Sequence, residues 1–180
     1  MRLSAALLTV SLAILASSGC ATSTASTSAA QPNARALAED FDLLIGPPWG
    51  GTLTYLDYTS NQRTEIRSTL LFARSPAAAG QDPMWQMSIG YNDEPNADSS
   101  QPVVLRLDGR MIGDETVIDR TVAPDGSVHI TTEEAGEDDN RAAVLRKVYT
   151  LSTNAASLQS LVRLKGESEF FERHIYRWTR

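Results

Sequence analysis

The sequence predicts an all-β fold: an antiparallel up-and-down meander barrel of about nine strands with one short N-terminal helix. Apolar and polar residues alternate with a period of two from Trp49 to the end of the chain, which is the spacing of half-buried strands. Short turn sequences separate these segments, as hairpins require. A long meander pairs its two edge strands by closing into a barrel, although a two-sheet sandwich would give the same alternation.

The one segment with helical spacing comes first. Leu37, Phe41 and Leu44 fall on one face of a helix expected within residues 35–44. Gly46-Pro47-Pro48 follows, and proline lacks the N–H that a continuing helix needs. We therefore expect the helix to end before Gly46.

The remaining elements are expected to be strands joined by hairpin turns. The clearest alternation places Trp85, Met87 and Tyr91 on one face of a strand. Turn sequences such as Asp108-Gly109 and Pro124-Asp125-Gly126 lie between the alternating segments. The expected strands occupy residues 52–59, 66–72, 85–91, 103–107, 116–122, 127–133, 143–151, 157–165 and 169–179.

The N-terminus has the pattern of a secretory signal. Arg2 precedes the apolar residues 3–16, a segment too short for a transmembrane helix, which needs about 20 apolar residues. Leu15-Ala16-Ser17-Ser18-Gly19-Cys20 resembles the lipobox of bacterial lipoproteins, although Ser17 stands where leucine is commonest. The resemblance implies cleavage before Cys20 and lipid modification of Cys20. An ordinary secretory signal with a chance cysteine is the alternative.

These features predict three regions. Residues 1–19 are the signal peptide, residues 20–35 are the modified cysteine and an Ala/Ser/Thr-rich tether, and residues 36–180 are the barrel domain. Cys20 is the only cysteine, so acylation would remove an otherwise unpaired thiol. Because Ala21 rather than aspartate follows it, the sequence resembles Gram-negative lipoproteins sorted to the outer membrane. We expect the lipid anchor to hold the domain there, on the periplasmic face.

The charge balance excludes nucleic acid as an expected partner. The chain has 16 Lys and Arg against 22 Asp and Glu, a formal net charge of −6. Proteins that bind phosphate backbones carry clustered Lys and Arg, and no such cluster occurs here. The membrane contact is therefore assigned to the lipid anchor.

The order of short helix, Gly46, Trp49, long meander and a final-strand arginine is similar to the calycin superfamily, which includes the lipocalins. The resemblance implies that Trp49 plugs the closed end of the barrel under an arginine, for which Arg177 and Arg180 are the two candidates. We assign Trp49 and Arg177 as this structural plug. Two prolines between Gly46 and Trp49 depart from the usual glycine-x-tryptophan spacing.

A barrel of this size either fills with side chains or holds one small ligand. Aromatic, methionine and polar side chains at one strand face are typical of both a ligand cavity and a plain core. The candidate cavity-lining residues are Tyr55, Asp57, Trp85, Met87, Tyr91, His174 and Tyr176.

Signals for catalysis, metals and cofactors are weak. The sequence has no Gly-x-Ser-x-Gly motif and no glycine-rich phosphate loop, so we assign no catalytic residue and no cofactor. His129 and His174 lie 45 positions apart without cysteine ligands nearby, and we assign no metal site. The acidic residues 133–139 are expected to form a solvated loop, with calcium binding as the alternative.

The leading functional hypothesis is a lipid-anchored, lipocalin-like protein that binds a small apolar or amphipathic molecule. The first alternative is an enzyme that uses carboxylate, tyrosine and arginine groups inside the barrel. The second is an envelope interaction or structural protein with a filled barrel. An open apolar cavity would favour the binding protein, and converging buried ionisable groups would favour the enzyme.

Overall fold

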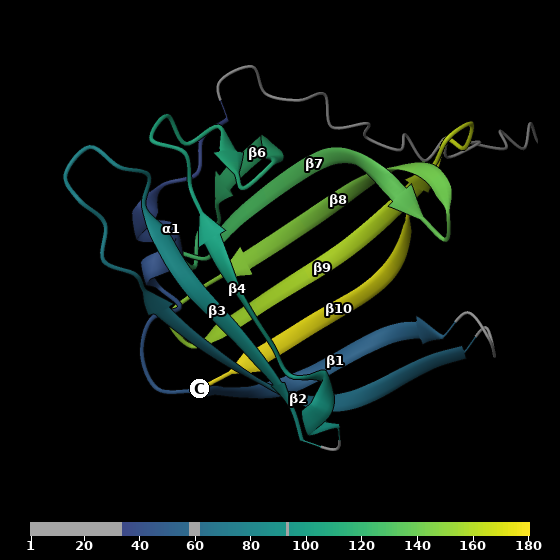
Figure 1. Ribbon diagram of the computed structural model, residues 1–180, viewed down its shortest axis with the longest axis horizontal. Coiled ribbons are helices and arrows are strands. Elements are labelled where there is room, and N and C mark those ends of the chain that lie inside the picture. Colours follow the sequence, from purple (N-terminus) through teal and green to yellow (C-terminus); the bar gives the residue numbers. More distant parts are fainter. Residues whose placement is uncertain (1–33, 58–61, 93) are drawn as a thin grey trace, which may run out of the picture.

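The computed structural model describes residues 34–57, 62–92 and 94–180, and Figure 1 shows one curved sheet with a short helix at one end. In the described residues the sheet has ten antiparallel strands in the order β4-β3-β2-β1-β10-β9-β8-β7-β6-β5. The elements are α1 (Ala38–Asp42), β1 (Trp49–Asp57), β2 (Gln62–Arg74), β3 (Met84–Tyr91), the 3₁₀ turn η1 (Pro95–Ala97), β4 (Ser99–Val104), β5 (Met111–Ile112), β6 (Glu115–Val122), β7 (Val128–Asp138), β8 (Arg141–Leu151), β9 (Ala155–Leu164) and β10 (Phe171–Thr179).

The sheet nearly closes into a barrel. Consecutive strands pair with each other except β4 and β5, which form the two edges, and β1 pairs with β10, so the first and last strands lie in the middle of the sheet. Its edges meet where Leu105 forms an isolated bridge with Ile112, flanked by a hydrogen bond from Gly113 N–H to the Val104 carbonyl at 2.7 Å. The predicted all-β meander barrel is confirmed. The additional strand is β5, whose two residues are too few to give an alternating pattern.

The helix is shorter than the predicted segment and is fixed by one buried ion pair. Asp40 is 3 % exposed, and its carboxylate accepts the Leu37 N–H at 2.7 Å. The Arg120 guanidinium on β6 donates to both oxygens of the same carboxylate, at 2.8 and 2.6 Å. Two parallel charge-assisted hydrogen bonds fix geometry as well as adding energy. They hold α1 across one end of the barrel with Phe41, 1 % exposed, pointing into the core.

Trp49 closes the same end of the barrel. Its side chain is completely buried, and its ring N–H donates to the Leu44 carbonyl at 2.9 Å. The arginine over the ring is Arg180, with its guanidinium carbon 3.9 Å from the ring centroid. Arg180 also donates to the carbonyls of Leu44 and Ile45, at 2.9 and 2.7 Å. Gly46 adopts φ +145° beside this guanidinium, which a residue with a side chain rarely does.

The assignment of Arg177 to the plug is therefore corrected. Arg177 lies opposite Thr52 in the β1–β10 pair, and its neighbours in β10, the buried Tyr176 and Trp178, face the core. Strand alternation consequently directs Arg177 outward, where it is exposed. Arg180 follows the last residue of β10, so the strand period does not restrict its direction.

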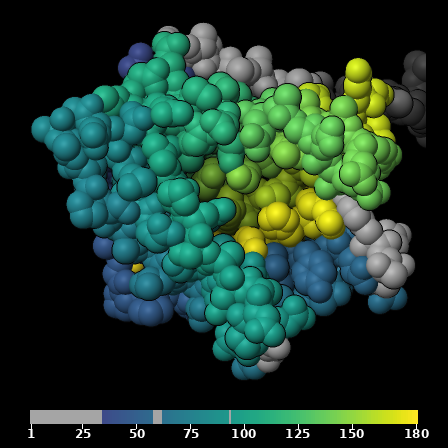
Figure 2. Space-filling view, viewed as in Figure 1, coloured from purple at the N-terminus to yellow at the C-terminus, as the bar shows by residue number. Residues whose placement is uncertain are grey.

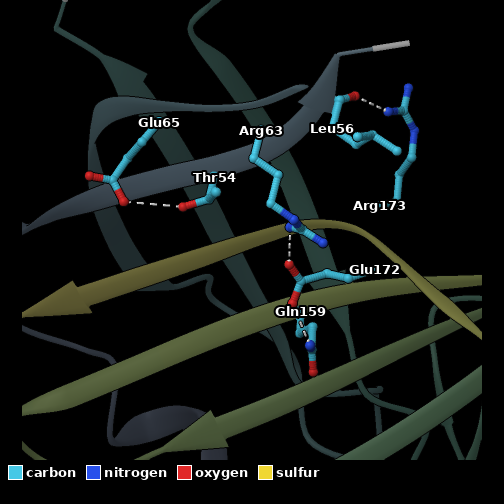
Figure 3. Close-up of polar contacts among 7 residues, drawn as sticks. All are labelled: Thr54, Leu56, Arg63, Glu65, Gln159, Glu172 and Arg173. Atoms are coloured by element: carbon cyan, nitrogen blue, oxygen red, sulfur yellow. Dashed lines mark hydrogen bonds and ion pairs between the residues drawn. The ribbon is translucent and has the colours of Figure 1, made fainter. Parts of the chain in front are cut away.

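A β-bulge in β10 re-aims the side chains near the open end. Pairing with β9 shifts between Glu172 and His174, which places Arg173 as the extra residue. Glu172 consequently lies on the outer face, whereas an unbroken strand would place it on the same face as His174. Figure 3 shows Glu172 in contact with Arg63 and, at 2.6 Å, with Gln159; nearby, Thr54 donates to Glu65 at 3.2 Å and Arg173 donates to the Leu56 carbonyl at 2.6 Å.

None of the helices within residues 34–57, 62–92 and 94–180 has the length and apolar character needed to cross a membrane.

Replacing Arg180 with alanine should lower the free energy of unfolding by about 1–2 kcal/mol, because the cation–π contact and two hydrogen bonds to carbonyls are lost. The control is Arg177→Ala, which removes the same side chain from the exposed face and should change stability by less than about 0.5 kcal/mol. Urea denaturation of both variants measures the difference. Equal losses would contradict the assignment of Arg180 to the plug.

Candidate functional site

The barrel encloses a cavity of about 600 Å³ beneath α1. Figure 2 shows a hollow in this face of the molecule, between the teal surface of β3 and β4 and the green surface of β7, with β9 and β10 visible inside. Most of the lining is apolar. It includes Phe41, Leu44, Leu70, Phe72, Met87, Ile89, Val103, Val104, Ile112, Tyr149, Leu151, Ala156, Leu158, Tyr176 and Trp178.

A second space of about 490 Å³ adjoins the first toward the other end of the barrel, near the β7–β8 hairpin. Its lining has a larger share of charged residues than that of the first space, and those found only here are Glu137, Asp138, Arg146 and Arg173. The two spaces share six lining residues, so they lie on either side of the same part of the barrel wall. The shared residues are Glu115, Glu134, Lys147, Ser160, His174 and Tyr176.

The polar side chains occupy one level of the barrel wall. Strand pairing sets five residues directly opposite one another on adjacent strands β7, β8, β9, β10 and β1: Thr132, Lys147, Ser160, His174 and Tyr55. The level two residues closer to α1 is mainly apolar and consists of Ile130, Tyr149, Leu158, Tyr176 and Leu53. The cavity therefore changes from apolar to polar along the barrel axis.

One buried ion pair anchors the polar level. Glu115 on β6 is 9 % exposed and forms a salt bridge with the Lys147 ammonium. The Thr132 hydroxyl, completely buried, donates to the other oxygen of Glu115 at 2.5 Å. Burial raises the pKa of Tyr149 well above its usual value, and the negative charges of Glu115 and Glu134 raise it further. Tyr149 therefore stays protonated and can donate a hydrogen bond.

Two further ring side chains near the ion pair, His174 in the polar level and Tyr176 in the apolar level, are neutral near pH 7. Burial lowers the pKa of His174, and the positive charges of Arg173 and Lys147 lower it further. Burial also raises the pKa of Tyr176, together with the hydrogen bond between its hydroxyl and that of Tyr91 at 2.6 Å. These groups supply hydrogen bonds and aromatic surface without adding charge.

Glu134 is the remaining carboxylate at the junction of the two spaces. It lines both of them, on β7 opposite Leu145 of β8. Within the described part of the chain, its carboxylate makes no salt bridge or side-chain hydrogen bond. Its neighbour Glu133 faces the other side of the sheet and pairs with Arg146.

The seven cavity candidates fall in different places. Tyr55, Met87, His174 and Tyr176 line the interior spaces. Trp85 lies under α1, where its ring N–H donates to Asp42 at 2.9 Å and its ring is 5.1 Å from that of Phe41.

Tyr91 contacts the cavity wall through its hydrogen bond to Tyr176. Asp57 is the last residue of β1, at the end of the barrel away from α1.

Sequence reasoning missed the charged residues of β6, β7 and β8. Lys147 shares one strand face with Leu145 and Tyr149, two residues away on either side. This period-two spacing was the signal in the sequence that could have placed Lys147 on the inward face. Glu115 lies directly after the short β5–β6 turn, where no periodic pattern was visible. The acidic segment 133–139 was expected to be a loop, but β7 extends to Asp138. In the residues that the structure describes, no three His, Cys, Asp or Glu side chains converge as a metal ion would need.

The sequence matches no known family model, and no curated protein is detectably related to it.

His174 should make stability depend on pH. Its pKa in the folded state lies below the ordinary value of about 6.5 that applies to the unfolded chain. Protonation therefore favours unfolding, and the stability contributed by neutral His174 is present above about pH 6.5 and lost as pH falls below it. Urea midpoints of wild type should drop more between pH 7 and pH 5 than those of His174→Gln. Parallel profiles would contradict this expectation.

Proposed function

We propose that this protein is a lipid-anchored, periplasm-facing binding protein of lipocalin-like architecture that holds one small apolar or amphipathic molecule inside its barrel. The observation that carries the proposal is the interior cavity of about 600 Å³. Sites for small molecules typically have about 300–1,000 Å³, a mainly apolar lining and a few placed polar groups. The cavity meets all three conditions.

The division of the lining supports an amphipathic occupant in particular. An apolar portion would contact residues such as Leu70, Met87 and Leu158, whose burial against it is favourable in proportion to area. A polar portion would reach the level of Lys147 and His174. A purely apolar molecule that covered this level would remove water from polar groups without replacing its hydrogen bonds.

The two alternatives receive less support. A structural protein needs no interior space, and the cavity counts against a filled barrel. For an enzyme, the clustered groups Glu115, Lys147 and Tyr149 are the relevant observation. Glu115 is engaged in its salt bridge with Lys147, and Tyr149 is held protonated because burial raises its pKa. This arrangement suits fixed recognition better than proton transfer near pH 7.

The anchor is a proposal from the sequence, because Cys20 and the tether up to residue 33 lie outside the described residues. The described residues support the anchor only through the place where the chain enters the barrel. The Ala36 N–H donates to the Gly109 carbonyl at 2.9 Å, so the chain enters the barrel beside α1. An attachment on that side leaves the opposite end of the barrel open to the periplasm.

Cys20→Ser should release the protein from membranes into the soluble periplasmic fraction, because several acyl chains, worth about 0.8 kcal/mol per buried methylene, would no longer hold it. Cell fractionation followed by immunoblotting measures the distribution. Ser18→Ala is the control, since it keeps the cysteine and a small residue before it. An unchanged membrane fraction for Cys20→Ser would refute the anchor.

Native mass spectrometry of the protein purified from the organism that makes it should show a bound molecule in addition to the polypeptide and its modification. The matched variants are Ala156→Trp and Ala155→Trp. Ala156 is buried and lines the cavity, whereas Ala155 is its exposed neighbour. Ala156→Trp should fill the cavity and abolish the mass of the bound molecule, whereas Ala155→Trp should leave that mass unchanged.

Circular dichroism checks that both variants are folded. Two results together would contradict a binding function whether or not the variants fold. The native mass spectrum of the wild-type protein would show only the polypeptide and its modification, and the protein would bind none of decylamine, decanol and decanoate.

A further inference from the structure

We infer that the occupant carries a positive charge: the geometry points to a small amine-bearing amphiphile whose ammonium group pairs with Glu134. This inference rests on the proposed function and names the chemical class of the molecule. It follows from the charges that remain at the polar level after the internal pairs are formed.

The ion pairs formed by side chains that line the two spaces do not include every carboxylate there. Glu115 and Lys147 neutralise each other in their salt bridge. Asp138 and Arg173 lie 3.5 Å apart at the open end. Arg146 also borders the second space, but its guanidinium pairs with Glu133 of the outer face and lies, by its carbon, 3.9 Å over the ring centroid of Phe170.

Glu134 is thus the carboxylate left to pair with a ligand at the junction of the two spaces. His174 does not offset it, because burial and nearby positive charges keep the imidazole neutral. Glu137, exposed at the rim of the second space, adds a further negative charge on the path outward. An anionic head group would meet this uncompensated charge, whereas an ammonium group would complement it.

The aromatic groups around this position favour a cation as well. Tyr149, Tyr176 and His174 line the cavity within the polar level and the apolar level below it. Tyrosine rings attract a cation placed over their faces, and the interaction strengthens where water is excluded. Both tyrosines remain uncharged, and one face of the Tyr176 ring is already covered by Trp178, with ring centroids 4.9 Å apart.

The apolar level indicates the chemical character of the rest of the ligand. Leu70, Met87 and Leu158 line the cavity toward α1, and Trp178 lies at its inner end. An alkyl or ring portion placed there would extend from an ammonium group at Glu134 into the closed end. The amine therefore lies toward the opening and the apolar portion toward Trp49.

The test compares three probes with the same ten-carbon chain: decylamine, decanol and decanoate, each below its micelle concentration. Isothermal titration calorimetry on the purified protein should give decylamine the lowest Kd and decanoate the highest, with at least tenfold between them. A charge-assisted hydrogen bond in a partly desolvated site supports a factor of this size.

Glu134→Gln should raise the Kd for decylamine about tenfold and leave that for decanol within about twofold, because only the charge is removed. Glu133→Gln is the matched control, one residue along β7 on the outer face, and should leave both values unchanged. Ala156→Trp should abolish binding of all three probes. Retained binding of decylamine by Ala156→Trp would show attraction to the acidic surface and overturn the inference.

The outcomes separate the inference from the function on which it rests. Binding of decanol or decanoate as tight as that of decylamine would overturn the cationic occupant and leave the binding function standing. If none of the three probes binds and the native mass spectrum shows no bound molecule, both the cationic ligand and the binding function are refuted. If Glu134→Gln does not fold, the ranking of the probes on the wild-type protein still decides.

Discussion

The closed end of the barrel is the constraint on which the cavity depends. A sheet rolled around an interior holds a ligand only if one end is sealed and the wall does not collapse inward. Two contacts seal it: the buried Asp40–Arg120 pair fixes α1, and Arg180 covers the ring of Trp49. Breaking a buried pair leaves an uncompensated charge, so the helix is committed to this position.

The polar level of the barrel wall, farther from the closed end, is produced by the register of the paired strands. Because paired strands place residues of one level side by side, Lys147, Ser160 and His174 become neighbours although they lie far apart in the chain. The bulge at Arg173 is part of this arrangement. It sends Glu172 to the outer contacts of Figure 3 and leaves His174 facing the cavity, which an unbroken strand cannot do.

Periodicity predicted the β fold well because each strand has one face in the core and one toward solvent. It located β3 to within one residue, since Trp85, Met87 and Ile89 are buried in alternation. It failed where alternation carries no information, at the two-residue strand β5 and after the bulge in β10. The choice between Arg177 and Arg180 failed for a related reason, because Arg180 lies beyond the regular strand.

The sequence alone determined the all-β class, the single helix and the approximate strand positions, because these follow from local spacing and turn residues. It also placed Tyr55, Met87, His174 and Tyr176 on inward faces. Only the tertiary structure decided that Glu115 meets Lys147 and that Glu134 lies at the junction of the two spaces. Strand register and barrel closure create those contacts, and no local pattern encodes the distance between residues on different strands.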